Sequence, residues 1–196
     1  MVISALILAA GASRRMGQPK MLLKWGKTTV LGHVISTFRQ AGIDDVVVVV
    51  GGAREQVEEI VNQNGARTVL NSEYARGEML SSLQRGIEAQ SPQTRGTLIA
   101  LGDQPQIQEG TVRLLCESFE SKKSRLVVPS FEMRRGHPWL VERSLWSELL
   151  GMNSEHSPRD FLNQFADEIQ YVRVQTSSIL ADLDTMDDYQ QARPQI

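Results

Sequence analysis

Short unbroken runs of hydrophobic residues recur along the chain. They cover residues 2–9, 46–50 and 97–101. A glycine follows each run, and these are Gly11, Gly51 and Gly102. Runs of this length that end at glycine are typical of strands buried on both faces, as in a parallel sheet. We therefore expect three buried parallel strands at these positions.

Between these runs, hydrophobic residues recur every three or four positions, which is the spacing of one face of a helix. The expected apolar helix faces are Leu31, Val34, Ile35 and Phe38; Val57, Ile60 and Val61; Leu80, Leu83 and Ile87; and Val112, Leu115, Cys116 and Phe119. Strands that alternate with helices predict βαβ units and helices on both faces of the sheet. The expected fold class is α/β: a three-layer, doubly wound, mostly parallel sheet of the Rossmann-like type.

The second half of the chain has a less regular pattern. It predicts strands at residues 125–129, 169–174 and 179–183, and short helices at residues 144–150, 157–166 and 187–192. No internal repeat and no glycine- or serine-rich linker interrupts the chain. We therefore expect residues 1–196 to form a single domain.

Composition excludes several classes of protein. The 196 residues are 41% hydrophobic and 22% charged, which excludes collagen-like and disordered chains. The formal net charge is −2, so nothing in the overall charge favours nucleic acid or a membrane as a partner. One cysteine, Cys116, cannot form an intrachain disulfide or a cysteine-based metal site. No hydrophobic run reaches the roughly 18 to 20 residues of a membrane helix, and no basic residue precedes the first run as in a secretion signal, so we expect a cytoplasmic protein.

A long connection follows the first predicted strand. Residues 11–28 show no helical or strand period, whereas loops between strand and helix usually take about 2 to 6 residues. Such a loop lies at the carboxyl edge of the sheet, where open α/β folds bind ligands. Its glycines allow a close backbone approach, its N–H groups can surround an anion, and its basic side chains add positive charge. These features predict a phosphate-binding loop, with a solvated basic loop as the alternative.

The spacing in this loop excludes two common phosphate-binding motifs. A P-loop needs Gly-Lys-Ser/Thr, whereas Lys20 follows Pro19. The Rossmann fingerprint needs glycine where Ser13 and Met16 stand. The pattern L-A-A-G-x-S-x-R-M-G-x-x-K, which begins at Leu8, instead resembles the nucleotidyltransferases of molybdenum cofactor synthesis, the molybdopterin guanylyl- and cytidylyltransferases.

This resemblance implies a fold similar to that of the nucleotide-diphospho-sugar transferases. It also implies that the loop binds a nucleoside triphosphate. The residues carried over are Leu8, Ala9, Ala10, Gly11, Ser13, Arg15, Gly17 and Lys20. We expect Arg15 and Lys20 to contact the phosphates.

A second motif, Gly102-Asp103-Gln104-Pro105, follows the third predicted strand. An aspartate at the carboxyl end of a strand, beside a basic loop, is suited to bind Mg²⁺ together with phosphate oxygens. A simple turn is the alternative, since Gly, Asp and Pro are common turn residues. The resembling family carries its metal-binding aspartate here, and Gly-Asp-Gln-Pro is similar to its cytidylyltransferase members. The resemblance implies that Gly102 and Asp103 bind nucleotide and metal and that Gln104 and Pro105 contact substrate.

Two further segments carry polar residues that the resemblance assigns to ligands. Asn71, Ser81 and Ser82 flank the predicted start of a helix, where capping is the alternative role, and in the family this segment contacts the nucleotide base. The run Arg134 to Pro138 is similar to the part of the cytidylyltransferases that lines the acceptor side. It implies substrate contacts for Arg135, Gly136 and His137, and we do not expect His137 to be a catalytic base.

The acidic segment Asp182 to Tyr189 is similar to the family pattern D-x-D-T-P-x-D, with methionine in place of proline at position 186. The end of a strand followed by a capped helix is the alternative explanation for much of this acidic pattern. The family uses this segment to complete its metal site, which implies Asp182 and Asp184 as candidates beside Asp103. We expect only one of these two aspartates to face the metal, and we expect it to be Asp182.

The expected reaction is nucleotidyl transfer, with Arg15, Lys20 and Asp103 as the catalytic residues and Mg²⁺ as cofactor. The resemblance implies CTP as donor, a molybdopterin-type acceptor, and a molybdenum hydroxylase apoenzyme that receives the product. Two alternatives remain. One is a nucleotidyltransferase that uses GTP or another acceptor, such as a sugar or polyol phosphate. The other is a non-catalytic carrier of the molybdenum cofactor.

Overall fold

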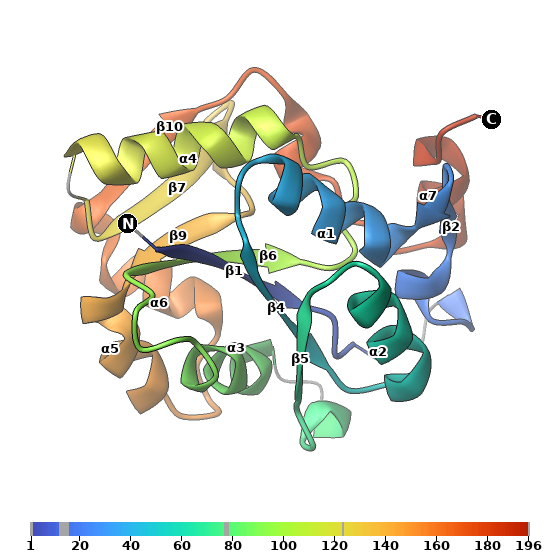
Figure 1. The fold of residues 1–196 in the computed structure, drawn as a ribbon. Coiled ribbons are helices and arrows are strands. Elements are labelled where there is room, and N and C mark those ends of the chain that lie inside the picture. Colours follow the sequence, from blue (N-terminus) through green and yellow to red (C-terminus); the bar gives the residue numbers. More distant parts are fainter. Residues whose placement is uncertain (1, 12–15, 77–78, 123, 196) are drawn as a thin grey trace.

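One mixed β-sheet forms the centre of the molecule (Figure 1). The computed structural model describes residues 2–11, 16–76, 79–122 and 124–195. Its strands in the sheet are β1 (Ile3–Leu8), β4 (Asp45–Val50), β5 (Arg67–Leu70), β6 (Gly96–Leu101), β7 (Leu126–Phe131), β8 (Arg134–Arg135), β9 (Trp139–Glu142) and β10 (Ile169–Arg173). Their order is β10-β7-β9-β6-β1-β4-β5, and β8 pairs with β7. The three buried strands predicted from the hydrophobic runs are β1, β4 and β6, which lie side by side and parallel.

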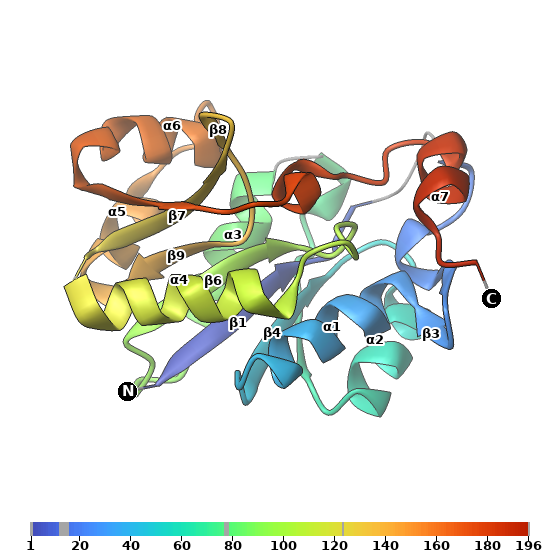
Figure 2. The ribbon, with the colours of Figure 1, turned by 90° about the horizontal axis from the view of Figure 1, so that it is seen from above.

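Helices cover both faces of this sheet. These helices are α1 (Val30–Gln40), α2 (Arg54–Gln63), α3 (Met79–Glu88), α4 (Glu109–Lys122), α5 (Trp146–Gly151) and α6 (Pro158–Gln164), and a further helix, α7 (Met186–Ala192), follows near the C-terminus. Figure 2 shows α1, α2 and α4 on one face and α3, α5 and α6 on the other. The predicted three-layer α/β class is therefore confirmed.

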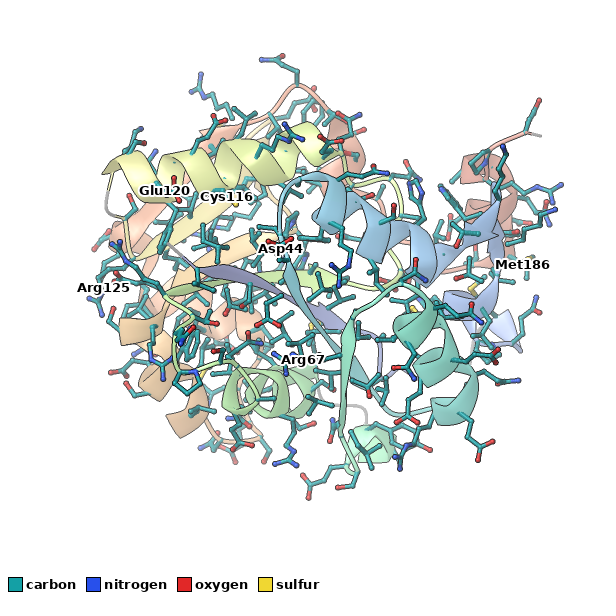
Figure 3. The ribbon with its side chains drawn as sticks, viewed as in Figure 1. Asp44, Arg67, Cys116, Glu120, Arg125 and Met186 are labelled. Atoms are coloured by element: carbon teal, nitrogen blue, oxygen red, sulfur yellow. The ribbon has the colours of Figure 1, made fainter. Side chains whose placement is uncertain are left out.

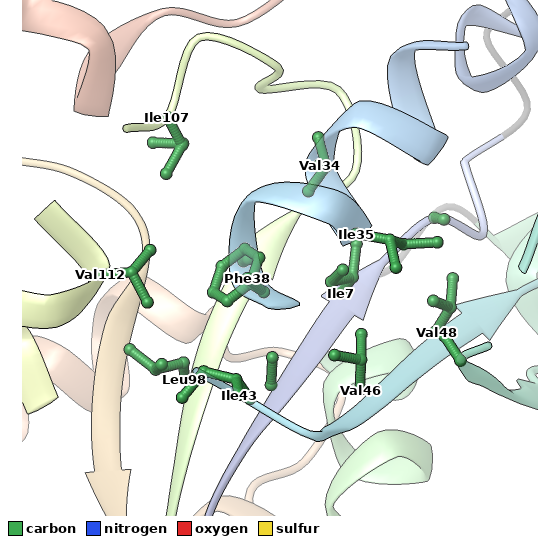
Figure 4. Close-up of a cluster of buried hydrophobic side chains, with 14 of the residues drawn as sticks. Ile7, Val34, Ile35, Phe38, Ile43, Val46, Val48, Leu98, Ile107 and Val112 are labelled. Carbon is green, nitrogen blue, oxygen red and sulfur yellow. The ribbon is translucent and has the colours of Figure 1, made fainter. Parts of the chain in front are cut away.

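The central strand β1 is buried on both faces because its side chains alternate between the two layers. Ala5 and Ile7 pack in one hydrophobic cluster with α1 and α4, while Leu6 and Leu8 pack in the other with α3. Figure 4 shows Ile7 facing Ile35 of α1. An unbroken apolar run is what such a doubly covered strand requires.

Strand β9 runs antiparallel to both of its neighbours, β6 and β7. It is reached through a hairpin in which β8 turns back along the end of β7. The sequence did not predict β5, β8 or β9, because short strands produce too few repeats to distinguish them from loops. It did predict the positions of β7, β10 and the three short helices α5, α6 and α7 to within a few residues.

The strand predicted at residues 179–183 is wrong. Residues Ser177–Leu180 form a 3₁₀ helix that begins with the Thr176 side chain accepting a hydrogen bond from the Ser178 N–H. Ile179 and Leu183 are fully buried, but their backbones bond to loops: the Ile179 carbonyl accepts from His137 N, and Leu183 N donates to the Asp103 carbonyl. Tertiary packing therefore explains the apolar pattern of this segment without a strand partner.

We call residues 174–185 the C-terminal strap, because they cross the carboxyl end of the sheet before α7 begins (Figure 2). The strap ends at Thr185, which caps α7 through reciprocal bonds with Asp188. The helix α7 then packs on the small hairpin of β2 (Lys24–Trp25) and β3 (Thr28–Thr29), where the Tyr189 hydroxyl donates to the Lys24 carbonyl at 2.6 Å. Across the described ranges, no helix has the length and hydrophobicity needed to span a membrane.

Candidate active site

The carboxyl ends of β1, β4 and β6 are packed closely together, and they form the floor of the candidate site. Leu8, Ala9 and Ala10 are buried there, and Ala9 N donates to the Val49 carbonyl at 3.0 Å. A Cβ atom on Gly102 would lie 3.0 Å from the Met21 sulfur and 3.2 Å from the Leu8 carbonyl oxygen. Glycine at position 102 therefore allows β6 and β1 to approach each other closely. The resemblance assigned Gly102 to direct contact with the nucleotide.

The predicted phosphate-binding loop begins at this floor. Gly11 is exposed, and Gly17 is exposed with a φ of +67°, a conformation that favours glycine. Ser13 and Arg15 lie outside the described residues, so their predicted contacts with phosphate stay predictions. The loop returns to the sheet at Lys20, the first residue of a 3₁₀ helix that Pro19 precedes.

Lys20 lies between two distant parts of the chain. Its Nζ atom donates to Asp103 Oδ2 at 2.6 Å, to the Leu183 carbonyl at 2.9 Å and to Asp184 Oδ1 at 3.4 Å. The Lys20 and Asp103 side chains are only 14% and 18% exposed, whereas Asp184 is 55% exposed. We call Lys20, Asp103 and Asp184 the lysine–aspartate cluster.

The lysine–aspartate cluster keeps Lys20 charged. Burial alone would lower the pKa of the Lys20 ammonium, but the charges and hydrogen bonds of Asp103 and Asp184 outweigh burial and raise that pKa. A fixed cation at the carboxyl end of the sheet is suited to bind a phosphate group.

Asp184, rather than Asp182, lies beside Lys20. Asp182 Oδ1 instead accepts a hydrogen bond from Gln104 Nε2. Loss of water around the Asp182 carboxylate raises its pKa, against the lowering effect of the Gln104 hydrogen bond, and the charges of Asp103 and Asp184 raise it further. The two aspartates of the strap thus serve different neighbours, because residues 181–184 form no regular strand, in which residues two apart would point to the same side.

Gln104 and Pro105, which the resemblance assigned to substrate, lie below the surface. Gln104 is only 2% exposed, and its amide N–H holds the strap through Asp182. Pro105 is also buried. Their position indicates that they support the loop after β6, so that Asp103 and the strap stay aligned.

Among the residues that the structure describes, no three His, Cys, Asp or Glu side chains gather closely enough to hold a metal ion by themselves. The expectation was Asp103 with only one of Asp182 and Asp184 at the metal, which needs no such group of three and stays a prediction. Asp103 and Asp184 do face the same Lys20 ammonium. Carboxylate oxygens arranged around a cation are a donor set that suits Mg²⁺, which binds through one or two carboxylates and completes its shell with phosphate oxygens and water.

Asn71 organises the start of α3. It is 1% exposed, and its Nδ2 atom donates to Ser81 Oγ at 3.0 Å and to Ser82 Oγ at 2.9 Å. Its Oδ1 atom accepts from Glu73 N. Of the three residues assigned to the nucleotide base, Asn71 and Ser82 are buried, and Ser81 is the more accessible one.

A cavity with a volume of about 730 Å³ opens between the β7–β8 hairpin and α6. Its described lining combines arginines, one histidine and apolar side chains, and no acidic residue is among these described residues: Met79, Met133, Arg134, Arg135, Gly136, His137, Trp139, Ser157, Pro158, Arg159 and Leu162. All three residues predicted for the acceptor side, Arg135, Gly136 and His137, line this cavity. We call it the arginine cavity.

His137 lines the arginine cavity and lies close enough to Asp103 to be affected by the charge of its carboxylate. Burial lowers the pKa of the His137 imidazole to about 4, although the charge of Asp103 acts in the opposite direction. The imidazole is therefore neutral at pH 7, when it can donate one hydrogen bond and accept another. The peptide bond between His137 and Pro138 is cis.

Cys116 lies apart from these groups. Figure 3 shows it on α4 beside Glu120, well separated from Met186 at the start of α7. Burial, together with the charges of Glu120 and Glu117, raises the pKa of the Cys116 thiol to about 11. The thiol is therefore protonated at neutral pH and unsuited to nucleophilic catalysis.

Several groups in and around the site were missed by sequence reasoning. The Leu183 carbonyl bonds Lys20, and Tyr171 and Asn163 bond the side chain of Arg135. A backbone carbonyl has no sequence signal. Tyr171 and Asn163 stand in ordinary strand and helix patterns, and only the folded arrangement brings them to Arg135.

Two proteins of known name are similar to this chain over nearly its full length. It is 27% identical over 187 residues to the molybdenum cofactor cytidylyltransferase of Escherichia coli K12, covering 95% of this chain and 93% of that protein. It is 29% identical over 192 residues to the nicotine blue oxidoreductase of Paenarthrobacter nicotinovorans, covering 94% of this chain and 93% of that protein. Similarity of this degree therefore includes proteins with different named activities.

Solved structures share the same fold. Rv0371c from Mycobacterium tuberculosis H37Rv superposes with a TM-score of 0.84 at 29% identity, covering 97% of both chains. A complex of that protein with manganese superposes with a TM-score of 0.80 at 27% identity, covering 100% of both chains. A family model described as the MobA-like NTP transferase domain matches residues 5–170. The fold and this match together show that the chain belongs to the MobA-like NTP transferase family.

Proposed function

We propose that the protein transfers CMP from CTP to a molybdopterin-type acceptor and releases pyrophosphate. One observation carries the proposal: the charge of Asp103 in the lysine–aspartate cluster reaches His137, which lines a cavity together with three arginines and, among the described lining residues, no acid. Nucleotidyl transfer needs such a pair of sites, because a triphosphate and a phosphorylated acceptor must meet at one phosphorus atom. The name of the Escherichia coli relative supports CTP and a molybdenum cofactor acceptor.

In this reaction, a phosphate oxygen of the acceptor attacks the α-phosphorus of CTP. A new P–O bond forms, the bond to the β-phosphate oxygen breaks, and pyrophosphate leaves with that oxygen. This chemistry depends on positioning and on charge stabilisation more than on a covalent group of the protein. Lys20 supplies positive charge to the phosphates, and we assign the same role to Arg15.

A divalent cation fits the acidic side of the cluster. Asp103 and Asp184 would hold Mg²⁺, with phosphate oxygens and water as its other ligands. When bound, the cation would neutralise charge on the triphosphate. The manganese complex of the mycobacterial protein is in keeping with a divalent metal in this fold.

The neighbouring residues orient the two substrates. Gly102 brings β6 close to β1, Gln104 holds the strap through Asp182, and Ser81 is the accessible hydroxyl near the expected base. The neutral His137 stands between the two substrates and can hydrogen-bond an acceptor phosphate without adding charge. We further propose that a molybdenum hydroxylase apoenzyme receives the product.

The decisive experiment is a pyrophosphate-release assay with CTP, GTP, ATP or UTP, with and without Mg²⁺, in the presence of molybdopterin. We expect release only with CTP, Mg²⁺ and acceptor together, and a cytidylylated product by mass spectrometry. Pyrophosphate release with GTP instead of CTP would support nucleotidyl transfer and refute the assignment of CTP as the donor. Pyrophosphate release with a nucleoside triphosphate and a sugar or polyol phosphate, but not with molybdopterin, would refute the assignment of a molybdopterin-type acceptor. Tight binding of the pterin without any pyrophosphate release would support the carrier alternative and refute the enzyme.

A further inference from the structure

The side chain of Arg135 is held from two sides on the wall of the arginine cavity. Its Nε atom donates to the Tyr171 hydroxyl at 2.8 Å, and its Nη1 atom donates to Asn163 Oδ1 at 2.9 Å. The guanidinium carbon also lies 5.7 Å from the centre of the Tyr171 ring, within reach of a cation–π contact. Arg135 thus has a fixed orientation, although it stands at the end of a two-residue strand.

The two partners come from elements that are themselves anchored. Tyr171 is in the middle of β10, which pairs with β7 along its length. Asn163 is on α6, whose Phe161 is fully buried and stacks on Trp139 with ring centres 5.9 Å apart. Figure 2 shows α6 beside β8, which carries Arg135. The orientation of the guanidinium is therefore set by the sheet edge and by a packed helix.

These two hydrogen bonds leave most of the Arg135 donors available. A guanidinium has five N–H groups in a planar fork that matches the oxygens of a phosphate. Throughout the described part of the chain, Tyr171 and Asn163 are the hydrogen-bond acceptors of this side chain. Neither partner is charged, so the positive charge of Arg135 is not neutralised by them.

We propose that Tyr171 and Asn163 are positioning residues that hold the Arg135 guanidinium in place to bind a phosphate monoester attached to a flat or apolar body. Met133, Trp139, Leu162 and Pro158 supply the apolar wall for that body, and Arg134 and Arg159 add positive charge. The assignment of this ligand as the acceptor rests on the proposed function. The phosphate clamp itself rests only on the geometry of the cavity.

The test uses phenyl phosphate as probe and two variants that keep the net charge, Tyr171→Phe and Asn163→Ala. Tyr171→Phe keeps the ring and removes only the hydroxyl acceptor. We expect either variant to weaken phenyl phosphate binding by about threefold to tenfold, the loss of one oriented charge-assisted contact. The ¹⁵N–¹H signal of Arg135 Nε should exchange faster with water in Tyr171→Phe, which reports the lost bond without any activity.

A matched pair of variants separates orientation from charge. Arg135→Gln and Arg134→Gln remove the same charge from the same cavity, and we expect Arg135→Gln to weaken phenyl phosphate binding at least threefold more. With the acceptor as substrate, Tyr171→Phe should raise the KM for acceptor and leave the KM for CTP unchanged. Urea unfolding of each variant should stay near wild type, because both hydrogen bonds are exposed.

Three results would overturn the clamp: no binding of phenyl phosphate to the wild type, equal binding by the wild type and both charge-preserving variants, or equal weakening by Arg134→Gln and Arg135→Gln. Failure of the proposed function gives a different pattern. If no nucleotide releases pyrophosphate but phenyl phosphate binding still depends on Tyr171 and Asn163, the clamp stands and the CTP assignment falls.

Discussion

Lys20 has three oxygen acceptors that come from two separate segments of the chain, the turn after β6 and the C-terminal strap. The sequence predicted that Lys20 and Asp103 belong to one site. Lys20 lies in the loop after the first predicted strand, Asp103 directly follows the third, and the carboxyl ends of parallel strands meet at one edge of a sheet. From the sequence we expected Asp182 to be the strap aspartate that faces the site, whereas Asp184 is the one that lies beside Lys20. That choice depends on Gln104, whose amide holds Asp182 aside.

Replacement of Lys20 by alanine should leave a folded protein with much less activity. We expect turnover to fall roughly 10²- to 10³-fold, as for other groups that stabilise developing charge. The measurement is the rate of pyrophosphate release at saturating substrates. Lys27→Ala is the matched control, because it removes the same charge from an exposed position in the β2–β3 hairpin. Equal rates for wild type and Lys20→Ala would remove Lys20 from the mechanism.

His137 should make the protein less stable in mild acid. Its folded pKa of about 4 lies below the ordinary value of 6.5, so the unfolded chain binds a proton that the folded chain does not. The corresponding stability is present above pH 6.5 and is lost progressively as the pH falls towards 4. When the pH falls from 7.5 to 5.0, we expect the free energy of unfolding of the wild type to decrease by about 2 kcal/mol more than that of His137→Asn. Urea unfolding at both pH values measures this, with His156→Asn as an exposed control.

At the scale of elements, the long regular segments were predictable and the short ones were not. The central strands and the four long helices each repeat their pattern often enough to be distinguished. The β7–β8 hairpin and the strap were not predictable, because they are held by contacts with each other. The Gly136 N–H donates to the Pro129 carbonyl, and the His137 N–H donates to the Ile179 carbonyl of the strap.

The contact between the hairpin and the strap predicts that Gly136→Ala destabilises the protein. A Cβ atom there would lie 2.3 Å from the Ile179 carbonyl oxygen, so backbone must move. We expect a loss of about 1 to 3 kcal/mol in the free energy of unfolding, measured with urea. Gly110→Ala in α4 is the control, since nothing lies within 4 Å of its added Cβ and alanine favours a helix. Similar stabilities for the two variants would contradict this contact.

At the scale of the whole molecule, the order of layers followed from the sequence, whereas the mixed character of the sheet did not. The antiparallel β9 inserts between β6 and β7, so the sheet is wider than the three hydrophobic runs imply. Trp139, the first residue of β9, lines the arginine cavity together with residues of α6. The residues Arg135 to His137 were therefore predictable as candidates, while the cavity that they line was not.

Binding of the nucleotide should stabilise the whole fold. A ligand present at about 100 times its Kd adds roughly 2.7 kcal/mol, which for a chain of this size raises the Tm by about 5 to 10 °C. We expect such a shift with CTP and Mg²⁺, and a smaller one when Mg²⁺ is removed with EDTA. Differential scanning fluorimetry measures it, with GTP, ATP and UTP as comparisons. A larger shift with GTP than with CTP would contradict the base assignment.

The strap has a consequence for how the site comes into being during synthesis. Every strand of the sheet has been made by Arg173, but the Leu183 carbonyl and Asp184 that complete the surroundings of Lys20 come later. A nascent chain that ends between these points can pair its strands without presenting a finished lysine–aspartate cluster. The lysine–aspartate cluster is thus completed only after the strands of the sheet have been synthesised, so an interrupted translation product that ends before Leu183 would lack it.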